Sequence, residues 1–319
     1  MMNISLFVVF VCMVFVFNHA EKTYYDEVAM DRSGQIIYGS NTNGIHISRD
    51  GGKTWKVSSD CIAPSSLDVS SDGQYALAVF NPSGPCGRAI TTSDSGQTWS
   101  KPTLPSRAKS FIDADVSGDG KVMIIVEWNT GNGQNDIYAS QDYGANFQEV
   151  NRTDCINLYS VTMSLAGDRI FVGQSYGLLL QSKDYGVTFN PVTTVPYQGS
   201  YSKLSCDEKG SYILASSSNG VSISTNGGLN FNGTTLPRNV NYRTAINGDG
   251  QYQYAIGSRQ MIYRSEDFGL TWATAENSPM TNWASVDCDR SGQFAVASSE
   301  ERGFYLTSDF GKTWTLANV

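Results

Sequence analysis

The chain has 319 residues, a formal net charge of −8, and only 16% charged residues against 40% hydrophobic ones. This composition excludes a charged helical bundle, which needs many Glu and Lys, and a largely disordered chain. It also argues against a nucleic-acid partner, because an acidic protein repels phosphate. The 31 glycines and 12% aromatic residues are typical of a turn-rich all-β protein.

The first twenty residues are predicted to be a signal peptide. Leu6–Phe17 is an almost unbroken apolar run that is too short to span a bilayer comfortably. We place cleavage after Ala20, so that residues 21–319 form the mature chain. The alternative is an uncleaved signal anchor, because no Lys or Arg precedes the run. No second run of membrane length follows, and we expect a secreted, extracellular protein without a membrane span in the mature chain.

An octapeptide then occurs seven times. It reads S-R-D-G-G-K-T-W at Ser48–Trp55 and T-S-D-F-G-K-T-W at Thr307–Trp314. The copies lie 41 to 48 residues apart, so seven units fill residues 21–319 and leave no room for a second domain. The third position of the octapeptide is occupied by Asp50, Asp94, Asp142, Asp184, Asn226, Asp267 and Asp309.

Each unit is predicted to contain four short strands. In the last unit these are Trp283–Cys288, Gln293–Ser298, Gly303–Thr307 and Thr313–Val319. A turn with a glycine follows the first strand of every unit, as hairpins require. Four antiparallel strands in each of seven units predict an all-β fold, a single seven-bladed β-propeller with one octapeptide per blade.

The first strand of each unit has two different faces. Positions four and six residues before the turn glycine are almost all apolar, and we expect them to pack against the neighbouring blade. The opposite face is small or charged, and we expect it to border a central channel. Its charged members are Glu27, Asp68, Asp113, Asp115, Lys203, Arg243 and Asp287.

The octapeptides resemble the Asp box, also called the bacterial neuraminidase repeat. Proteins with this repeat include sialidases, xyloglucanases, sortilin-type receptors and photosystem II assembly factors. The resemblance implies that the box forms the turn between the third and fourth strands, on the face opposite an active site. Its Ser or Thr and its Asp then hold the turn through hydrogen bonds to the backbone. We therefore interpret the box Asp residues as structural, and neither as catalytic nor as metal ligands.

An enzyme is the alternative function. The sialidase resemblance implies an R-I-P segment and three arginines around a substrate carboxylate, and the sequence has no R-I-P segment. Xyloglucanases place an acid pair between two propellers, whereas only one is predicted here. Another glycoside hydrolase would need two carboxylates roughly 5–10 Å apart. The candidate acids near the channel mouth are Asp26, Glu27, Asp113 and Glu127.

One histidine, His46, remains after the signal peptide, which argues against Ser-His-Asp chemistry and a histidine zinc site. We predict no metal and no cofactor. Aromatic side chains near the channel mouth suit sugar stacking or protein docking, although they could instead seal the tops of the blades. The ligand-binding candidates are Trp128, Trp283, Tyr159, Tyr201, Tyr242 and Arg243. The leading hypothesis is a monomeric, non-enzymatic propeller that binds a glycan or an extracellular protein through its loop-rich face.

Five cysteines follow the signal peptide. Cys61 and Cys86 are predicted to lie on the same face of one blade and to form a disulfide. Cys206 and Cys288 lie on the apolar face of inner strands and are predicted to be buried thiols, which leaves Cys155 unpaired. Two N-glycosylation sequons begin at Asn151 and Asn232.

Overall fold

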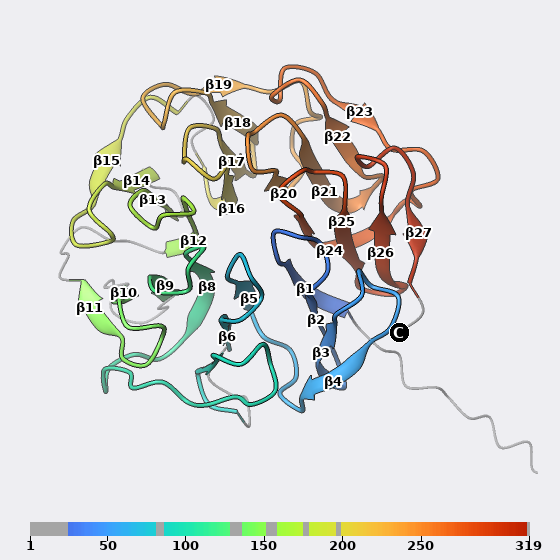
Figure 1. The fold of residues 1–319 in the computed structure, drawn as a ribbon. Coiled ribbons are helices and arrows are strands. Elements are labelled where there is room, and N and C mark those ends of the chain that lie inside the picture. The colour runs from blue at the N-terminus through green and yellow to red at the C-terminus, as the bar shows by residue number, and fades with distance from the viewer. Residues whose placement is uncertain are drawn as a thin grey trace, which may run out of the picture.

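The computed structural model describes residues 25–80, 86–127, 136–150, 158–174, 179–195 and 199–317. These residues form 27 strands and no helix, so the all-β class is confirmed. Figure 1 shows the strands gathered into sheets that surround a common centre. The predicted signal peptide, Trp128, Asn151 and Cys155 lie outside the described residues.

The first three sheets follow the chain in order. The first contains β1 (Tyr25–Met30), β2 (Ile37–Asn41), β3 (Gly44–Ser48) and β4 (Lys56–Ser59). The second contains β5 (Ser66–Val69), β6 (Ala76–Val79) and β7 (Ala89–Thr92). The third contains β8 (Phe111–Val116), β9 (Met123–Glu127), β10 (Ile137–Ser140) and β11 (Gln148–Val150).

The remaining strands continue the same antiparallel pattern. The fourth sheet contains β12 (Leu158–Met163), β13 (Ile170–Gln174), β14 (Leu179–Ser182) and β15 (Asn190–Val192). The fifth contains β16 (Tyr201–Cys206), β17 (Ile213–Ser217), β18 (Gly220–Ser224) and β19 (Asn232–Gly233).

The last sheet has eight strands and consists of two four-stranded units. One unit is β20 (Tyr242–Ile246), β21 (Gln253–Gln260), β22 (Tyr263–Ser265) and β23 (Ala273–Thr274). The other is β24 (Thr281–Cys288), β25 (Ala295–Ser299), β26 (Gly303–Thr307) and β27 (Thr315–Leu316). The units are joined where the end of β21 pairs with the start of β24, at Ser258 and Asn282.

Two outer strands differ from the expected pattern. β27 begins at Thr315 and not at the predicted Thr313, because the preceding turn holds Thr313 through hydrogen bonds to Asp309. In the second sheet the fourth strand is reduced to a single bridge between Thr91 and Ser100. Pro102 then follows, and a proline cannot donate to a strand ladder. The chain instead bridges to the next unit at Thr103 and Asn146.

The octapeptide turns share one set of hydrogen bonds. In the first copy the Ser48 hydroxyl oxygen accepts the Gly52 amide at 2.8 Å, and the Asp50 carboxylate accepts the Thr54 amide at 2.9 Å. The Thr54 hydroxyl donates to the other Asp50 oxygen at 2.7 Å, and the Trp55 indole N–H donates to the Gly52 carbonyl. The amide bonds to the first and third positions recur in the other six copies.

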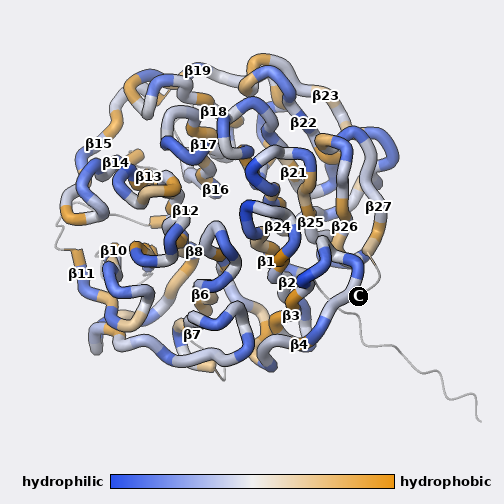
Figure 2. Tube along the Cα trace, in the orientation of Figure 1, coloured by the Kyte–Doolittle hydropathy of each residue, from blue (hydrophilic) through white to orange (hydrophobic). Residues whose placement is uncertain are grey.

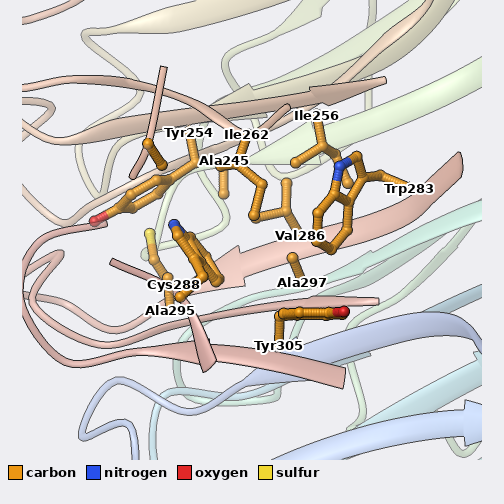
Figure 3. Packing of buried hydrophobic residues seen from close by; sticks show 12 residues of the cluster. Ala245, Tyr254, Ile256, Ile262, Trp283, Val286, Cys288, Ala295, Ala297 and Tyr305 are labelled. Carbon is orange, nitrogen blue, oxygen red and sulfur yellow. The ribbon is translucent and has the colours of Figure 1, made fainter. Parts of the chain in front are cut away.

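The cores lie between neighbouring sheets. Figure 2 shows hydrophobic residues concentrated along the strands and hydrophilic residues in many of the turns. Figure 3 shows one such core, in which Ala245 and Tyr254 from one unit meet Val286 and Tyr305 from the next. The apolar positions of the inner strands contribute to these cores, as the alternating pattern predicts.

A circuit of backbone hydrogen bonds joins the turns that follow the inner strands β1, β5, β8, β12, β16, β20 and β24. In each bond the amide of one turn donates to a carbonyl of the next turn, at 2.7 to 3.2 Å. The last turn donates back to the first, so the circuit closes. The donors are Arg32, Ser71, Gly118, Leu165, Glu208, Gly248 and Arg290.

Candidate site at the central channel

A polar cavity of about 170 Å³ lies between the inner strands. Its lining includes residues of all seven strands named above, and among them are Glu27, Asp68, Asp115, Lys203 and Asp287. These belong to the face that the sequence pattern assigned to a channel. The alternation of the inner strands therefore places charged side chains around the axis and apolar ones in the cores.

Three of these carboxyl groups connect neighbouring inner strands. Asp68 accepts the Val116 amide at 2.7 Å, and Asp115 accepts the Met163 amide at 2.8 Å. Asp287 in β24 accepts the amide of Met30 in β1 at 2.7 Å, which links the last unit to the first. Each acid lies five residues before its turn glycine, so one sequence position serves the same purpose in three units.

Burial raises the pKa of these three carboxyl groups. The pKa of Asp287 rises to about 7, because burial and the charge of Asp68 both disfavour its ionised form. Burial raises the pKa of Asp115 to about 6. Burial and the neighbouring Asp115 raise the pKa of Asp68 well above its usual value.

Asp113 is held by three partners at the start of β8. It accepts the Ser66 hydroxyl at 2.7 Å and the Val161 amide at 3.0 Å. The Lys203 ammonium group lies 3.0 Å from the first of its carboxylate oxygens and 3.3 Å from the second. This candidate acid therefore has an ion-pair partner from β16, the second inner strand along from β8, which the sequence did not indicate.

Glu27 and Asp26 lie beside the same charges. Burial raises the pKa of Glu27, while the charges of Arg243 and Lys203 lower it and that of Asp113 raises it. Burial and then Glu300 raise the pKa of Asp26, while Arg243 lowers it. Glu27 and Asp113, two of the four candidate acids, thus belong to one electrostatic cluster with Lys203 and Arg243.

Glu127 lies elsewhere, which corrects the expectation that it borders the channel mouth. It ends β9, is 2% exposed, and accepts the Tyr138 hydroxyl at 2.7 Å. It also accepts the Lys109 amide at 2.7 Å and the Ser110 amide at 3.2 Å. Its carboxylate therefore anchors the segment before β8 instead of facing a ligand.

A second pocket of about 260 Å³ opens at the N-terminal ends of the inner strands, and we call it the mouth pocket. The Ser202 hydroxyl oxygen in its wall is buried without a hydrogen-bond partner among the described residues. The Arg243 guanidinium also has no hydrogen bond or ion pair within the described part of the chain, although the charges of Asp26 and Glu27 act on it. The lining is Ser65, Ile112, Asp113, Tyr159, Ser202, Lys203, Asn241, Tyr242 and Arg243.

Several of the predicted binding aromatics are core residues. Tyr201 is 1% exposed, and Tyr242 meets the ring of Tyr263 edge to face at 6.0 Å. Trp283 is buried against Tyr305, and its indole N–H donates to the Gln260 carbonyl at 3.0 Å. The expectation of exposed rings is thus not met at Tyr201, Trp283 and Tyr242, which is 0% exposed, whereas Tyr159 borders the mouth pocket.

A β-bulge explains the position of Trp283 and Tyr201. Strict alternation would place Trp283 on the same face as Ser285 and Asp287, toward the channel. The pairing with β25 shifts register between Trp283 and Ser285, and β16 shifts in the same way after Tyr201. An extra residue reverses the face of every residue beyond it, so the bulge turns these rings into the core.

The opposite end of the channel carries a cluster of charges that sequence reasoning missed. Glu208 accepts Arg32 at 2.5 Å and Arg290 at 3.0 Å through the same oxygen. Arg32 lines the central cavity from this side. In the sequence these three charged residues lie on separate turns, and only the closed circuit of turns brings them together.

The cysteines and the second sequon have defined surroundings. Cys61 and Cys86 form a disulfide with Cα atoms 5.7 Å apart, and Cys206 and Cys288 are free thiols. Asp60 lies beside the disulfide, but a disulfide removes both thiolates as metal ligands. Asn232 is exposed in β19, where a glycan would have room.

Comparisons with known proteins agree with this architecture. Models of the BNR/Asp-box repeat match residues 46–57 and 262–274. The comparison with curated protein sequences gives no match. No helix in the described ranges is long and apolar enough to cross a membrane.

Solved β-propellers share the fold at low sequence identity. A GH74 xyloglucanase from Xanthomonas campestris has a TM-score of 0.72 at 14% identity, over 92% of this chain and 54% of that one. YCF48 bound to a D1 peptide has a TM-score of 0.65 at 17% identity, over 90% and 92%. The Cps50 (Swd1) propeller domain of Myceliophteria thermophila has a TM-score of 0.67 at 12% identity, over 90% and 99%.

The expected relationship to Asp-box propellers is therefore confirmed, at the level of the repeat and the β-propeller fold. The chain spans about half the length of the xyloglucanase. These neighbours include both a glycoside hydrolase and a protein solved with a bound peptide, so the fold alone does not choose between an enzyme and a binding protein.

Proposed function

We propose that this protein is a secreted, monomeric, seven-bladed propeller with one Asp box per blade that binds a glycan or an extracellular protein at the mouth pocket. The circuit of seven turn-to-turn hydrogen bonds and the seven equivalent box turns support this number of blades. The apolar N-terminal run and the disulfide between Cys61 and Cys86 support an extracellular location.

The mouth pocket is the observation that carries the proposal. It combines Arg243, which has no bonded partner among the described residues, with the unpaired hydroxyl of Ser202 and the amide of Asn241. Buried polar groups without partners are costly, and a ligand that supplies the missing hydrogen bonds recovers that cost. Binding sites commonly place a few such polar groups in an otherwise enclosed pocket.

The charges around the pocket favour a ligand that is neutral overall. Lys203 is neutralised by Asp113 at 3.0 Å, and Arg243 lies in the field of Asp26 and Glu27. A hydroxyl-rich sugar or a polar peptide segment offers both donors and acceptors to such a surface, and Tyr159 offers an aromatic wall. The solved complex of YCF48 with a D1 peptide adds weight to the peptide option, since that propeller is similar in fold.

Arg243→Gln tests the proposal directly. We expect it to weaken binding on a glycan array or an extracellular-protein panel by at least tenfold, because it removes the unpaired charged donor of the pocket. Arg49→Gln is the matched control, since Arg49 is an exposed arginine in a box turn and should leave binding unchanged. Equal binding by both variants would place the site outside the mouth pocket.

A glycoside hydrolase remains the second candidate, and one observation favours it. Glu27 is a buried acid with a raised pKa close to a second acid, Asp113, as general acid catalysis requires. Hydrolysis assays on the same glycans would reveal turnover. Loss of that turnover in both Glu27→Gln and Asp113→Asn would establish the enzyme and refute a purely binding role.

A further inference from the structure

Several interfaces between neighbouring units contain the same slot, on the side of the molecule opposite the mouth pocket. One wall is the residue two positions after a turn glycine, and the other is the fourth residue of the octapeptide in the next unit. Aromatic rings fill three of these slots at 4.5 to 5.2 Å between ring centres and 28° to 32° between ring planes. The pairs are Tyr75 with Tyr143, Tyr212 with Phe268, and Tyr252 with Phe310.

The slot between the last and the first unit lacks its second ring. Phe294 supplies the turn aromatic, but the fourth residue of the first octapeptide is Gly51. A groove of about 350 Å³ lies there. Its walls include Phe294, Leu306, Ile37, Met30, Thr313 and Lys53, and we call it the seam groove.

The backbone at Gly51 is able to carry a side chain. Its φ of 68° is close to the 60° of Tyr143 and the 61° of Phe310 at the equivalent position. A Cβ added to Gly51 would meet nothing nearer than the Gly34 carbonyl oxygen at 3.5 Å. The groove therefore results from the residue chosen at this position, and the fold itself has room for a ring.

A second glycine shows that the slot can be filled in another way. Gly227 has the same place in the fifth octapeptide, and the guanidinium of Arg169 lies 2.9 Å from the position of its missing Cβ. Phe294 is shorter than Arg169 and cannot reach across to fill its own slot. Among the slots discussed above, only the one at the seam is left as a half-open groove over an aromatic ring.

We propose that the seam groove binds an aromatic side chain from a partner protein. The ring would lie on Phe294 as Phe310 lies on Tyr252 and as Phe268 lies on Tyr212. The chain itself shows, in three places, that an aromatic ring is the group that this slot accommodates. Lys53 in the wall favours a partner segment that carries an acidic residue beside the aromatic one.

The test uses N-acetyl-L-phenylalaninamide as the probe and N-acetyl-L-leucinamide as the apolar control, with binding followed by saturation-transfer NMR on the mature protein. We expect the phenylalanine probe to bind at least fivefold more tightly than the leucine probe. Gly51→Tyr fills the slot and should abolish binding. Gly51→Ala changes the same backbone position but leaves the slot open, and should bind as the natural protein does.

A gain-of-site variant completes the test. Phe310→Gly recreates the seam arrangement over Tyr252, and we expect the binding stoichiometry to rise from one to two. Thermal unfolding of each variant shows whether it is folded, and the Gly51 pair decides the outcome if Phe310→Gly does not fold. Unchanged binding in Gly51→Tyr, or equal binding of both probes, would overturn the proposal.

Discussion

The Asp of each octapeptide acts through two oxygens with different partners. In the sixth copy one oxygen of Asp267 accepts the Thr271 amide at 2.9 Å, and the other accepts the Thr271 hydroxyl at 2.6 Å. The fifth copy has Asn226 instead, and its single oxygen still accepts the Asn230 amide at 2.9 Å. The amide bond is therefore the part of the motif that both residue types preserve.

This difference predicts the effect of two substitutions. Asp267→Ala removes both bonds and the bond from the Ser265 hydroxyl, and we expect it to lower the free energy of unfolding by about 1–2 kcal/mol. Asp267→Asn keeps the amide bond, as Asn226 does, and should cost less than half as much. Urea denaturation of the two variants measures the difference. Equal losses would mean that the hydroxyl bond, which only Asp makes, carries the stability of the turn.

At the scale of strands, the repeating strand pattern could be predicted from the sequence, but the β-bulges that interrupt it could not. The spacing of the octapeptides and turn glycines predicted the inner strands and their channel face, and Asp68, Asp115 and Asp287 lie there. The bulge after Trp283 leaves no mark in the residue pattern, so the direction of that ring was predicted wrongly. Register depends on pairing with a second strand, which a single strand's sequence does not contain.

The candidate site was readable only in part, for a related reason. Glu27, Asp113 and Arg243 were predicted near one another because alternation assigned them to one face. The ion pair between Lys203 and Asp113 joins β16 to β8, past the intervening strand β12. The position of the Glu127 side chain is set by other contacts, since its hydrogen-bond partners come from the segment before β8 and from β10. Contacts of this kind depend on how strands and units are placed next to one another, which no local pattern describes.

The inner strands also determine how stability depends on pH. Asp115 and Asp287 have pKa values of about 6 and 7 in the folded protein, above the 3.8 of an unburied Asp. The folded state therefore binds more protons than the unfolded state between about pH 4 and pH 7, and stability falls as the pH rises through this range.

The box carboxylates act in the opposite direction. Hydrogen bonds from Thr54 and Thr98 lower the pKa of Asp50 and Asp94 to about 2, so their contribution is lost as the pH falls below about 4. We expect the melting temperature to be highest near pH 4–5. Asp287→Asn should flatten the decline between pH 5 and pH 8, because an amide does not titrate. If the melting temperature of that variant declines with pH as steeply as that of the natural protein, the pH dependence comes from other groups.

At the scale of the whole molecule, non-covalent contacts close the ring in the part of the chain that the structure describes. The first sheet and the last unit are connected by the Met30 amide on Asp287, the Ser298 hydroxyl on the Asp26 carbonyl, and the Arg290 amide on the Arg32 carbonyl. In the described residues no strand of the last unit pairs with a strand of the first sheet. Every other pair of neighbouring units is also tied together by the chain itself.

This geometry predicts uneven amide exchange with solvent. The amides of Met30 and Arg290 should exchange at least tenfold faster than those of Val116 and Gly118, which make the equivalent bonds within the ring. Opening the seam breaks no chain connection, so it costs less than separating two tethered units. Hydrogen–deuterium exchange with mass spectrometry measures both pairs, and equal rates would show that the ring opens only as a whole.

The same contacts give ring closure the character of a binding equilibrium between two ends of one molecule. Its strength depends on the effective concentration that the intervening units impose on those ends. A looser ring would lower that concentration. A ligand that contacts the first and the last unit at once would stabilise the closed ring. We therefore expect the force and the time needed to open the ring to depend on this one junction, although the seven units have equivalent turns.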